Sequence, residues 1–399
     1  MNPRTRLTPR SGRRPTIRSL ATAPLVAVLV SLVVAATASA GSWSDPSRIW
    51  SRHIGGDWAV PTAMVTLDDS TIVAAYVVHS STVSTQVVRS VDNGATWSTP
   101  QTVSLANTYG LAIAGSGTSV DVAMIACENA GCGIRYRRST DSGQTFSPAS
   151  TLSTLDASSD PAVARGSDGT VAVAWYSADR GKIFIRVSND GGTTFGPRVA
   201  LWRAASYGGN YALAIGDGVI YAVAGFGARG IQVRRSFDGG ATWTSSRSLG
   251  RYDDDGLAVG SHPHLRVSAA GDLAYVSWVR TSEDGLTPVY RRTKDEGASW
   301  SRRRDLAKPF REASAPFIAV DGAGAHATFM LRYCTTNACK TTTYYRQSAD
   351  GWKWSARETV TEEPQDSSFP MGIGLTDRPV VFYWHYAEYW EHIAVRTRP

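Results

Sequence analysis

The loop sequence GRYDDDGLAVGSHPH, which begins at residue 250, gathers acidic and imidazole side chains that could do chemistry. Residues 253–255 are three consecutive aspartates, and His262 and His264 follow them. Carboxylate oxygens bind calcium, imidazoles bind zinc, and two carboxylates can together cleave a glycosidic bond. An acidic run in a long loop is also typical of a solvated surface. We expect no metal or other cofactor, keep calcium as the alternative, and take Asp254 as a candidate catalytic residue.

The sequence HYAEYWE, which begins at residue 385, places aromatic and acidic side chains next to one another. If this segment is extended, Tyr386 and Glu388 point the same way, because the side chains of a strand alternate between its two sides. One interpretation is an aromatic hairpin that packs the fold or binds a sugar ring by stacking, with Tyr389 as a contact residue. The other is that Tyr386 and Glu388 are catalytic.

Several other loops carry side chains suited to holding a sugar. Aromatic rings offer a sugar an apolar surface with a polar edge, and arginine pairs with carboxylates through two parallel hydrogen bonds. These residues are scattered along the chain, so they can act together only if a repeated fold brings their loops to one face. The predicted ligand-binding residues are Trp58, Tyr207, Tyr252, His262, Arg280, Arg311, Glu312 and Tyr389.

A short polar turn recurs six times between these loops. Its clearest copy is SFDGGATWT from residue 236; SVDNGATWS, STDSGQTFS, SNDGGTTFG and TKDEGASWS are close copies, and SADGWKWS is a shortened one. The aspartates of these turns follow one another at intervals of 49, 49, 48, 57 and 55 residues, a period typical of propellers and solenoids. They are Asp92, Asp141, Asp190, Asp238, Asp295 and Asp350.

The residue types of this turn, called the box turn below, favour a structural role. The aspartate can accept hydrogen bonds from backbone N–H groups of its own turn, and the glycine two positions later permits a positive φ. The aromatic residue near the end can bury its ring between neighbouring repeats. We therefore expect the six aspartates to stabilise the fold rather than to catalyse a reaction.

Between successive box turns the sequence predicts four short strands. In the third repeat the runs PAVA, TVAVAWY, IFIRV and VALW are rich in apolar and β-branched residues and are separated by turn residues. Four antiparallel strands per repeat make the blade of an all-β propeller. Three further strands follow the last box turn, whereas SWSDP at residues 42–46 matches TWSTP after the first box turn. We therefore predict a seven-bladed propeller closed by the N-terminal strand, with six blades as the alternative.

The pattern S/T-x-D-x-G-x-T-W/F resembles the Asp-box, or BNR, repeat of the sialidase superfamily. The resemblance implies box turns between the third and fourth strands of each blade, on the face opposite the ligand site. It also implies three arginines that bind a sugar carboxylate, a tyrosine nucleophile activated by a glutamate, and an aspartate acid/base. Tyr386 and Glu388 lie in the last blade, where the family's nucleophile occurs. However, Ala59 stands where the first arginine is expected, and no other predicted inner strand begins with arginine.

The four cysteines form two pairs with the same C-x4-C spacing at the same point of their repeats. Cys127 and Cys132 make the first pair, and Cys334 and Cys339 the second. In an exported protein this pattern favours two disulfides, each across the neck of a hairpin. Zinc is the alternative, but neither loop has histidines at ligand spacing.

Residues 1–40 have the features of a secretory signal peptide, and we predict the propeller over residues 41–399. The segment carries six arginines without acid or lysine, then an apolar stretch, and ends in ASA. Its RR pair leaves twin-arginine export as an alternative route. Without it the formal charge falls from +7 to 7 − 6 = +1, which favours neither nucleic acid nor an anionic membrane as partner. We expect a secreted monomer without membrane insertion.

Two hypotheses for function follow. The first, which the missing arginine favours, is a binding propeller whose loops recognise a glycan or another extracellular polymer. The second is a glycoside hydrolase or lyase that uses a Tyr–Glu pair, or two carboxylates from residues 253–255, Glu283, Glu312 and Glu388. Propellers host both functions, so the fold does not decide between them.

Overall fold

The computed structural model describes residues 43–398 except 54–57, 82, 106, 129–130, 155, 158, 205–209, 227–228, 252–264, 283–284, 308–311, 322–323, 335–338, 362–366 and 387–389. All regular elements in these residues are β-strands. The described part of the chain contains no helix with the length and hydropathy needed to cross a membrane.

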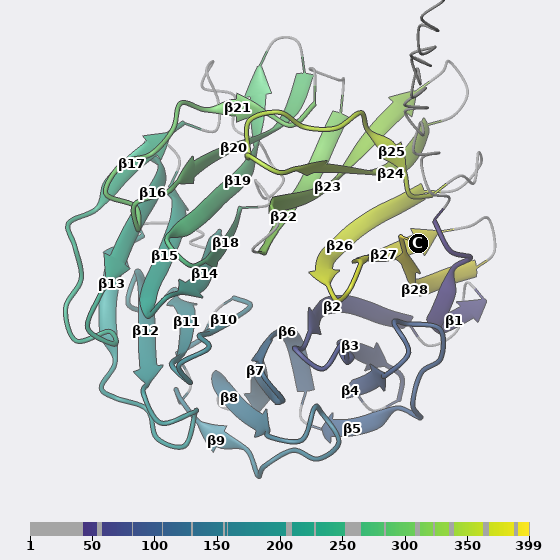
Figure 1. Cartoon of the computed structure of the whole chain (residues 1–399). Coiled ribbons are helices and arrows are strands. Elements are labelled where there is room, and N and C mark those ends of the chain that lie inside the picture. The colour runs from purple at the N-terminus through teal and green to yellow at the C-terminus, as the bar shows by residue number, and fades with distance from the viewer. Residues whose placement is uncertain are drawn as a thin grey trace, which may run out of the picture. The chain divides into compact units, whose positions relative to one another are not determined.

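The strands form seven four-stranded antiparallel blades arranged in a ring, as predicted, rather than the six of the alternative (Figure 1). Blade 1 comprises β2 (Trp58–Thr66), β3 (Ile72–His79), β4 (Val83–Ser90) and β5 (Gln101–Ser104). Blade 2 comprises β6 (Asn107–Ser116), β7 (Ser119–Glu128), β8 (Gly131–Ser139) and β9 (Ser150–Thr151). Blade 3 comprises β10 (Ala162–Arg165), β11 (Val171–Ser177), β12 (Lys182–Ser188) and β13 (Val199–Arg203). Blade 4 comprises β14 (Tyr211–Gly216), β15 (Val219–Phe226), β16 (Gly230–Ser236) and β17 (Arg247–Gly250).

The remaining three blades follow the same order. Blade 5 comprises β18 (Arg266–Ala270), β19 (Leu273–Ser282), β20 (Gly285–Thr293) and β21 (Arg304–Asp305). Blade 6 comprises β22 (Glu312–Asp321), β23 (Gly324–Cys334), β24 (Cys339–Ser348) and β25 (Glu358–Thr359). Blade 7 comprises β26 (Ser367–Leu375), β27 (Pro379–Tyr386), β28 (Trp390–Thr397) and β1 (Ser47–His53). One parallel pair, Thr341 opposite Ser367, links blades 6 and 7.

Blade 7 combines the two ends of the propeller. Its outer strand β1 pairs antiparallel with β28, from Ser47 opposite Val395 to His53 opposite Trp390. Just before β1, the Ser44 hydroxyl accepts a hydrogen bond from the backbone N–H of Thr397 at 3.0 Å, across 353 residues of sequence. The N-terminal strand therefore closes the ring, as the sequence predicts, and covers the edge of β28.

The inner strands β2, β6, β10, β14, β18, β22 and β26 contact one another in this order around the ring. Prolines stand inside several of them, for example Pro61, Pro316 and Pro370. Proline is tolerated there because an inner strand is an edge strand whose outward N–H groups need no partner in the ladder. The strand register shifts at or beside each of these three prolines.

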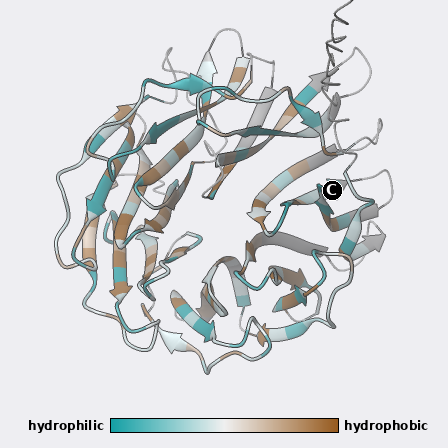
Figure 2. Cartoon of the chain, viewed as in Figure 1, coloured by the Kyte–Doolittle hydropathy of each residue, from teal (hydrophilic) through white to brown (hydrophobic). Residues whose placement is uncertain are grey.

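The core consists of hydrophobic clusters between neighbouring blades, and each of the seven interfaces has one. Figure 2 shows the hydrophobic residues as brown bands along the strands. The aromatic residue of each box turn packs against the cluster between its own blade and the preceding one, which ties neighbouring repeats together. These residues are Trp97, Phe146, Phe195, Trp243, Trp300 and Trp354.

Candidate ligand-binding face

The strand directions bring several predicted site residues to one face of the propeller. The inner strands begin, and the second strands of the blades end, on the face opposite the box turns; we call it the loop face. Trp58 and Glu312 are the first residues of β2 and β22, and Tyr386 is the last residue of β27. The partly buried Arg280 lies near the end of β19, opposite Thr287. These four predicted site residues thus share the loop face.

The other predicted site residues lie outside the described residues, in the loops that lead into the inner strands and in the β27–β28 turn. Their roles stay predictions, as does calcium binding by the loop after β17. In the part of the chain that the structure describes, no three His, Cys, Asp or Glu side chains gather as metal ligands. The residues outside are Tyr207, Tyr252, Asp254, His262, Arg311, Glu388 and Tyr389.

An arginine that sequence analysis missed begins an inner strand. We expected no arginine at this position in any blade, but β18 starts at Arg266. Its guanidinium lies 4.7 Å from the ring centre of Phe317, and Nη1 donates a hydrogen bond to the Leu265 carbonyl at 3.0 Å. The residue is partly exposed, and desolvation by the neighbouring protein lowers the pKa of Arg266 to about 10. An anionic ligand would compensate this charge.

A second group that sequence analysis missed joins blades 3 and 4. The Tyr211 hydroxyl, at the start of β14, donates to the Asp160 carbonyl at 2.5 Å and lies 2.9 Å from the Ser159 hydroxyl. Burial raises the pKa of Tyr211, so the phenol stays protonated and holds the segment before β10 in place. The carboxylate of Asp160 packs so closely on Gly110 of β6 that a Cβ there would overlap it. Asp160 is thus fixed at the loop face.

One small cavity lies beside β27 and β28, in the blade that carries Tyr386. Its volume is about 40 Å³, which suits water or a small ion but not a sugar ring. Arg48, Tyr383, His385, His392 and Arg396 contribute polar or charged groups to its lining. The cavity therefore adds positive charge near the last blade without forming a sugar site.

The box turns have the same hydrogen bonds in five of the six copies. In the first, Asp92 accepts from the Thr96 N–H at 2.9 Å and from the Thr96 hydroxyl at 2.6 Å. The Ser90 hydroxyl donates to Asp92 at 2.7 Å and accepts from the Gly94 N–H at 2.8 Å. The carboxylates are thus occupied within their own turns, and we propose that they hold the turns together.

The residue after each box aspartate has a positive φ, which the sequence did not reveal. Glycine takes this position three times, but Asn93, Ser142 and Glu296 adopt φ of 57°, 55° and 53°. Most of these residues also receive a hydrogen bond from the preceding blade. Thus Arg138 donates to the Gly191 carbonyl at 3.0 Å, and Asn189 to the Gly239 carbonyl at 3.2 Å. The box turns are therefore also joints between blades.

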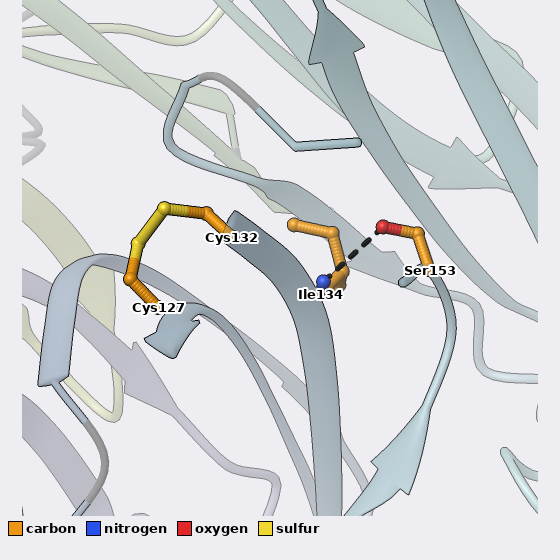
Figure 3. Close-up of a disulfide and its surroundings, with 4 residues drawn as sticks. All are labelled: Cys127, Cys132, Ile134 and Ser153. Atoms are coloured by element: carbon orange, nitrogen blue, oxygen red, sulfur yellow. Dashed lines mark hydrogen bonds between the residues drawn. A yellow bond between two sulfur atoms is a disulfide. The ribbon is translucent and has the colours of Figure 1, made fainter. Parts of the chain in front are cut away.

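A disulfide joins Cys127 and Cys132 at the neck of the β7–β8 hairpin, as predicted (Figure 3). Next to it, the backbone N–H of Ile134 donates to the Ser153 hydroxyl at 3.2 Å, which ties β8 to the segment after β9. The second pair, Cys334 and Cys339, occupies opposite positions of the β23–β24 ladder. Bonding between these two cysteines stays a prediction, because only their backbone is described.

No known protein-family profile and no curated protein matches the chain. Among solved structures it is similar to a polysaccharide lyase, the PL25 ulvanlyase bound to -[GlcA(1-4)Rha3S]-, with a TM-score of 0.54 and 11% identity over 86% of this chain and 95% of that one. It is also similar to the phage phi92 endosialidase, with a TM-score of 0.48 and 11% identity over 81% and 70%. For the NanB sialidase from Streptococcus pneumoniae the TM-score is 0.48, with 11% identity over 88% of this chain and 70% of that one. The likeness to the lyase shows the propeller fold alone.

Proposed function

We propose that this chain is a secreted glycan-binding propeller whose loop face recognises an acidic sugar of an extracellular polymer. Residues 1–40 serve as the export signal in this proposal, and residues 41–399 form the monomeric propeller. The observation that carries it is Arg266, a desolvated guanidinium at the start of an inner strand on the face where the candidate loops meet.

The surroundings of Arg266 fit recognition of a carboxylate or sulfate group. Stacking on Phe317 fixes the plane of the guanidinium, so less side-chain entropy is lost when it pairs with a planar carboxylate. Trp58 begins β2, another inner strand that starts on the loop face, and in this proposal it supplies an aromatic residue for a sugar ring of the polymer. Charge recognition and stacking together are typical of acidic-sugar binding.

The test measures binding of sialosides, uronate oligosaccharides and matched neutral oligosaccharides by calorimetry. We expect the wild-type protein to bind an acidic class, Arg266→Gln to bind it about tenfold or more weakly, and Arg266→Lys to recover part of the affinity. Lys294→Gln, which changes an exposed lysine in the box turn of blade 5 on the opposite face, is the charge-matched control. Binding of neutral sugars alone, or full affinity in a folded Arg266→Gln variant, would contradict the proposal.

The alternative function is a glycoside hydrolase or lyase, and the position of Tyr386 at the loop-face end of β27 favours keeping it. Hydrolysis is measured with chromogenic glycosides, and lyase action by the absorbance of the unsaturated product. Turnover that Tyr386→Phe or Glu388→Gln abolishes, with the melting temperature unchanged, would make the protein an enzyme. Turnover equal in both variants and the wild type would remove these residues from the reaction.

A further inference from the structure

A second charged hollow lies at the outer edge of blades 5 and 6, on the side of the box turns. Its volume is about 350 Å³, within the range of ligand sites. It is formed where the start of β21 meets the sixth box turn. The lining residues are Tyr290, Arg302, Arg303, Arg304, Asp305, Trp352 and Trp354.

The sixth box turn, which lines this hollow, differs from the other five. It is one residue shorter, and Asp350 accepts hydrogen bonds from the N–H groups of Trp352 and Lys353, each at 2.7 Å. Trp354 is the usual box aromatic, since its ring packs edge-on against Tyr290 and its Nε1 donates to the Tyr290 hydroxyl at 3.0 Å. Trp352 is therefore an additional aromatic residue, and it remains 38% exposed.

Trp352 holds two arginines in place. The guanidinium carbons of Arg292 and Arg304 lie 4.0 Å and 4.1 Å from the centre of its ring. Arg292 is buried and also donates to the Asp350 carbonyl, so it is part of the turn. Arg304 is exposed, and stacking fixes its plane while its N–H groups remain able to bind a ligand. Such an arginine is prepared to bind an oxyanion in a bidentate manner.

The charge of this hollow is positive. Among the described residues Arg302 and Arg304 form no ion pair, and Asp305 is the one acidic residue in the lining. Further arginines lie near this hollow. Burial lowers the pKa of Arg291, and the positive charges of Arg303 and Arg247 lower it further. Of these arginines Arg303 also lines the hollow, where it adds to the positive charge.

We propose that this hollow, called the Arg–Trp hollow, binds an acidic polysaccharide through its sulfate or carboxylate groups, with Arg302 and Arg304 as the contact residues and Trp352 as the positioning residue. It lies on the opposite side of the blades from the loop face and does not depend on the function proposed for that face. A polysaccharide held there would anchor the propeller to a polymer while the loop face is free to act.

The test measures the affinity of the purified protein for dextran sulfate, polygalacturonate and neutral dextran at fixed ionic strength. We expect binding of one or both acidic polymers and none of neutral dextran. Arg304→Gln should weaken binding about tenfold. Trp352→Ala, which keeps every charge, should weaken it as well, because the guanidinium of Arg304 is no longer held.

Two controls separate this site from general attraction and from the loop face. Arg203→Gln removes the same charge from blade 3 and should leave binding unchanged. Arg304→Gln should weaken binding to the same extent in an Arg266→Gln background, in which the loop-face site no longer contributes. Equal losses in Arg203→Gln and Arg304→Gln, full binding by Trp352→Ala, or equally tight binding of oligothymidylate would each overturn the proposal. If Arg266→Gln alone abolished polymer binding, the site would belong to the loop face.

Discussion

At the scale of single residues, hydrogen bonds within one box turn lower the pKa of its aspartate. Partial burial alone would raise the pKa of Asp141, but hydrogen bonds from Ser139 and Thr145 outweigh it and lower the pKa from 3.8 to about 2. Hydrogen bonds also lower the pKa of Asp238 and of Asp295 to about 2, chiefly those from Thr242 and from Ser299. The charged form is therefore the one that the fold stabilises.

The variant Asp141→Ala tests, at one box turn, whether the charged carboxylate stabilises the fold. A carboxyl group whose pKa is lower in the folded than in the unfolded chain stabilises the fold at every pH above its pKa in the unfolded chain. That contribution is lost as the pH falls from about 4 to about 2. We expect the variant to lose about 1–2 kcal/mol of unfolding free energy at pH 7, and the difference to shrink over this acid range. Urea unfolding of both proteins at pH 7, 4 and 2 measures this difference in unfolding free energy.

Asp179→Ala, in the exposed turn between β11 and β12, is the control and should cost little at any of these pH values. A difference between the Asp141 variant and the wild type that stays constant down to pH 2 would mean that the carboxylate charge is not what holds the turn.

At the scale of elements, the strands and turns of each blade could be predicted because their signals are local. The hydrogen-bond partners of Asp92 lie within four residues, and the runs predicted for blade 3 correspond to β10–β13. Contacts one repeat apart could not be predicted: Tyr211 bonds the Asp160 carbonyl across 51 residues. Arg266 was missed because no change of residue type marks where β18 begins after the long preceding loop sequence. The loop residues of the candidate site have no periodic signal at all.

The two C-x4-C hairpins make a prediction at this scale. The double variant Cys127→Ser/Cys132→Ser should lose about 2 kcal/mol, because the disulfide closes only a short loop in the unfolded chain. Cys334→Ser/Cys339→Ser should lose a similar amount if the second pair is also bonded. Thiol titration of the unreduced, denatured wild-type protein should then find no free thiol among its four cysteines; two free thiols would show that the second hairpin is open.

At the scale of the whole molecule, stability is shared among seven similar interfaces, and the two that border blade 7 contain residues from both ends of the propeller. Ile49 and Trp50 of β1 pack on the cluster that also contains Ile393 and Val395 of β28. Without β1 this cluster loses its cover, and β28 becomes an open edge strand.

Starting the chain at residue 54 instead of residue 41 should therefore expose β28. We expect its amide hydrogens to exchange rapidly in the shortened protein and the protein to associate into larger species, whereas amides of β11 in blade 3 stay protected. Hydrogen exchange by mass spectrometry and light scattering measure both effects. Slow amide exchange in β28 of a monomeric shortened protein would show that blade 7 remains folded without its outer strand.

The pairing of β1 with β28 also has a consequence for biosynthesis. A ribosome makes β1 before the other strands of the propeller and β28 after them, so the nascent β1 has no partner until the rest of the propeller has been synthesised. An interrupted chain can fold several blades but cannot join its ends. Closure of the ring thus reports that the whole propeller has been synthesised, and an unfinished product presents two unpaired strand edges to proteases and chaperones.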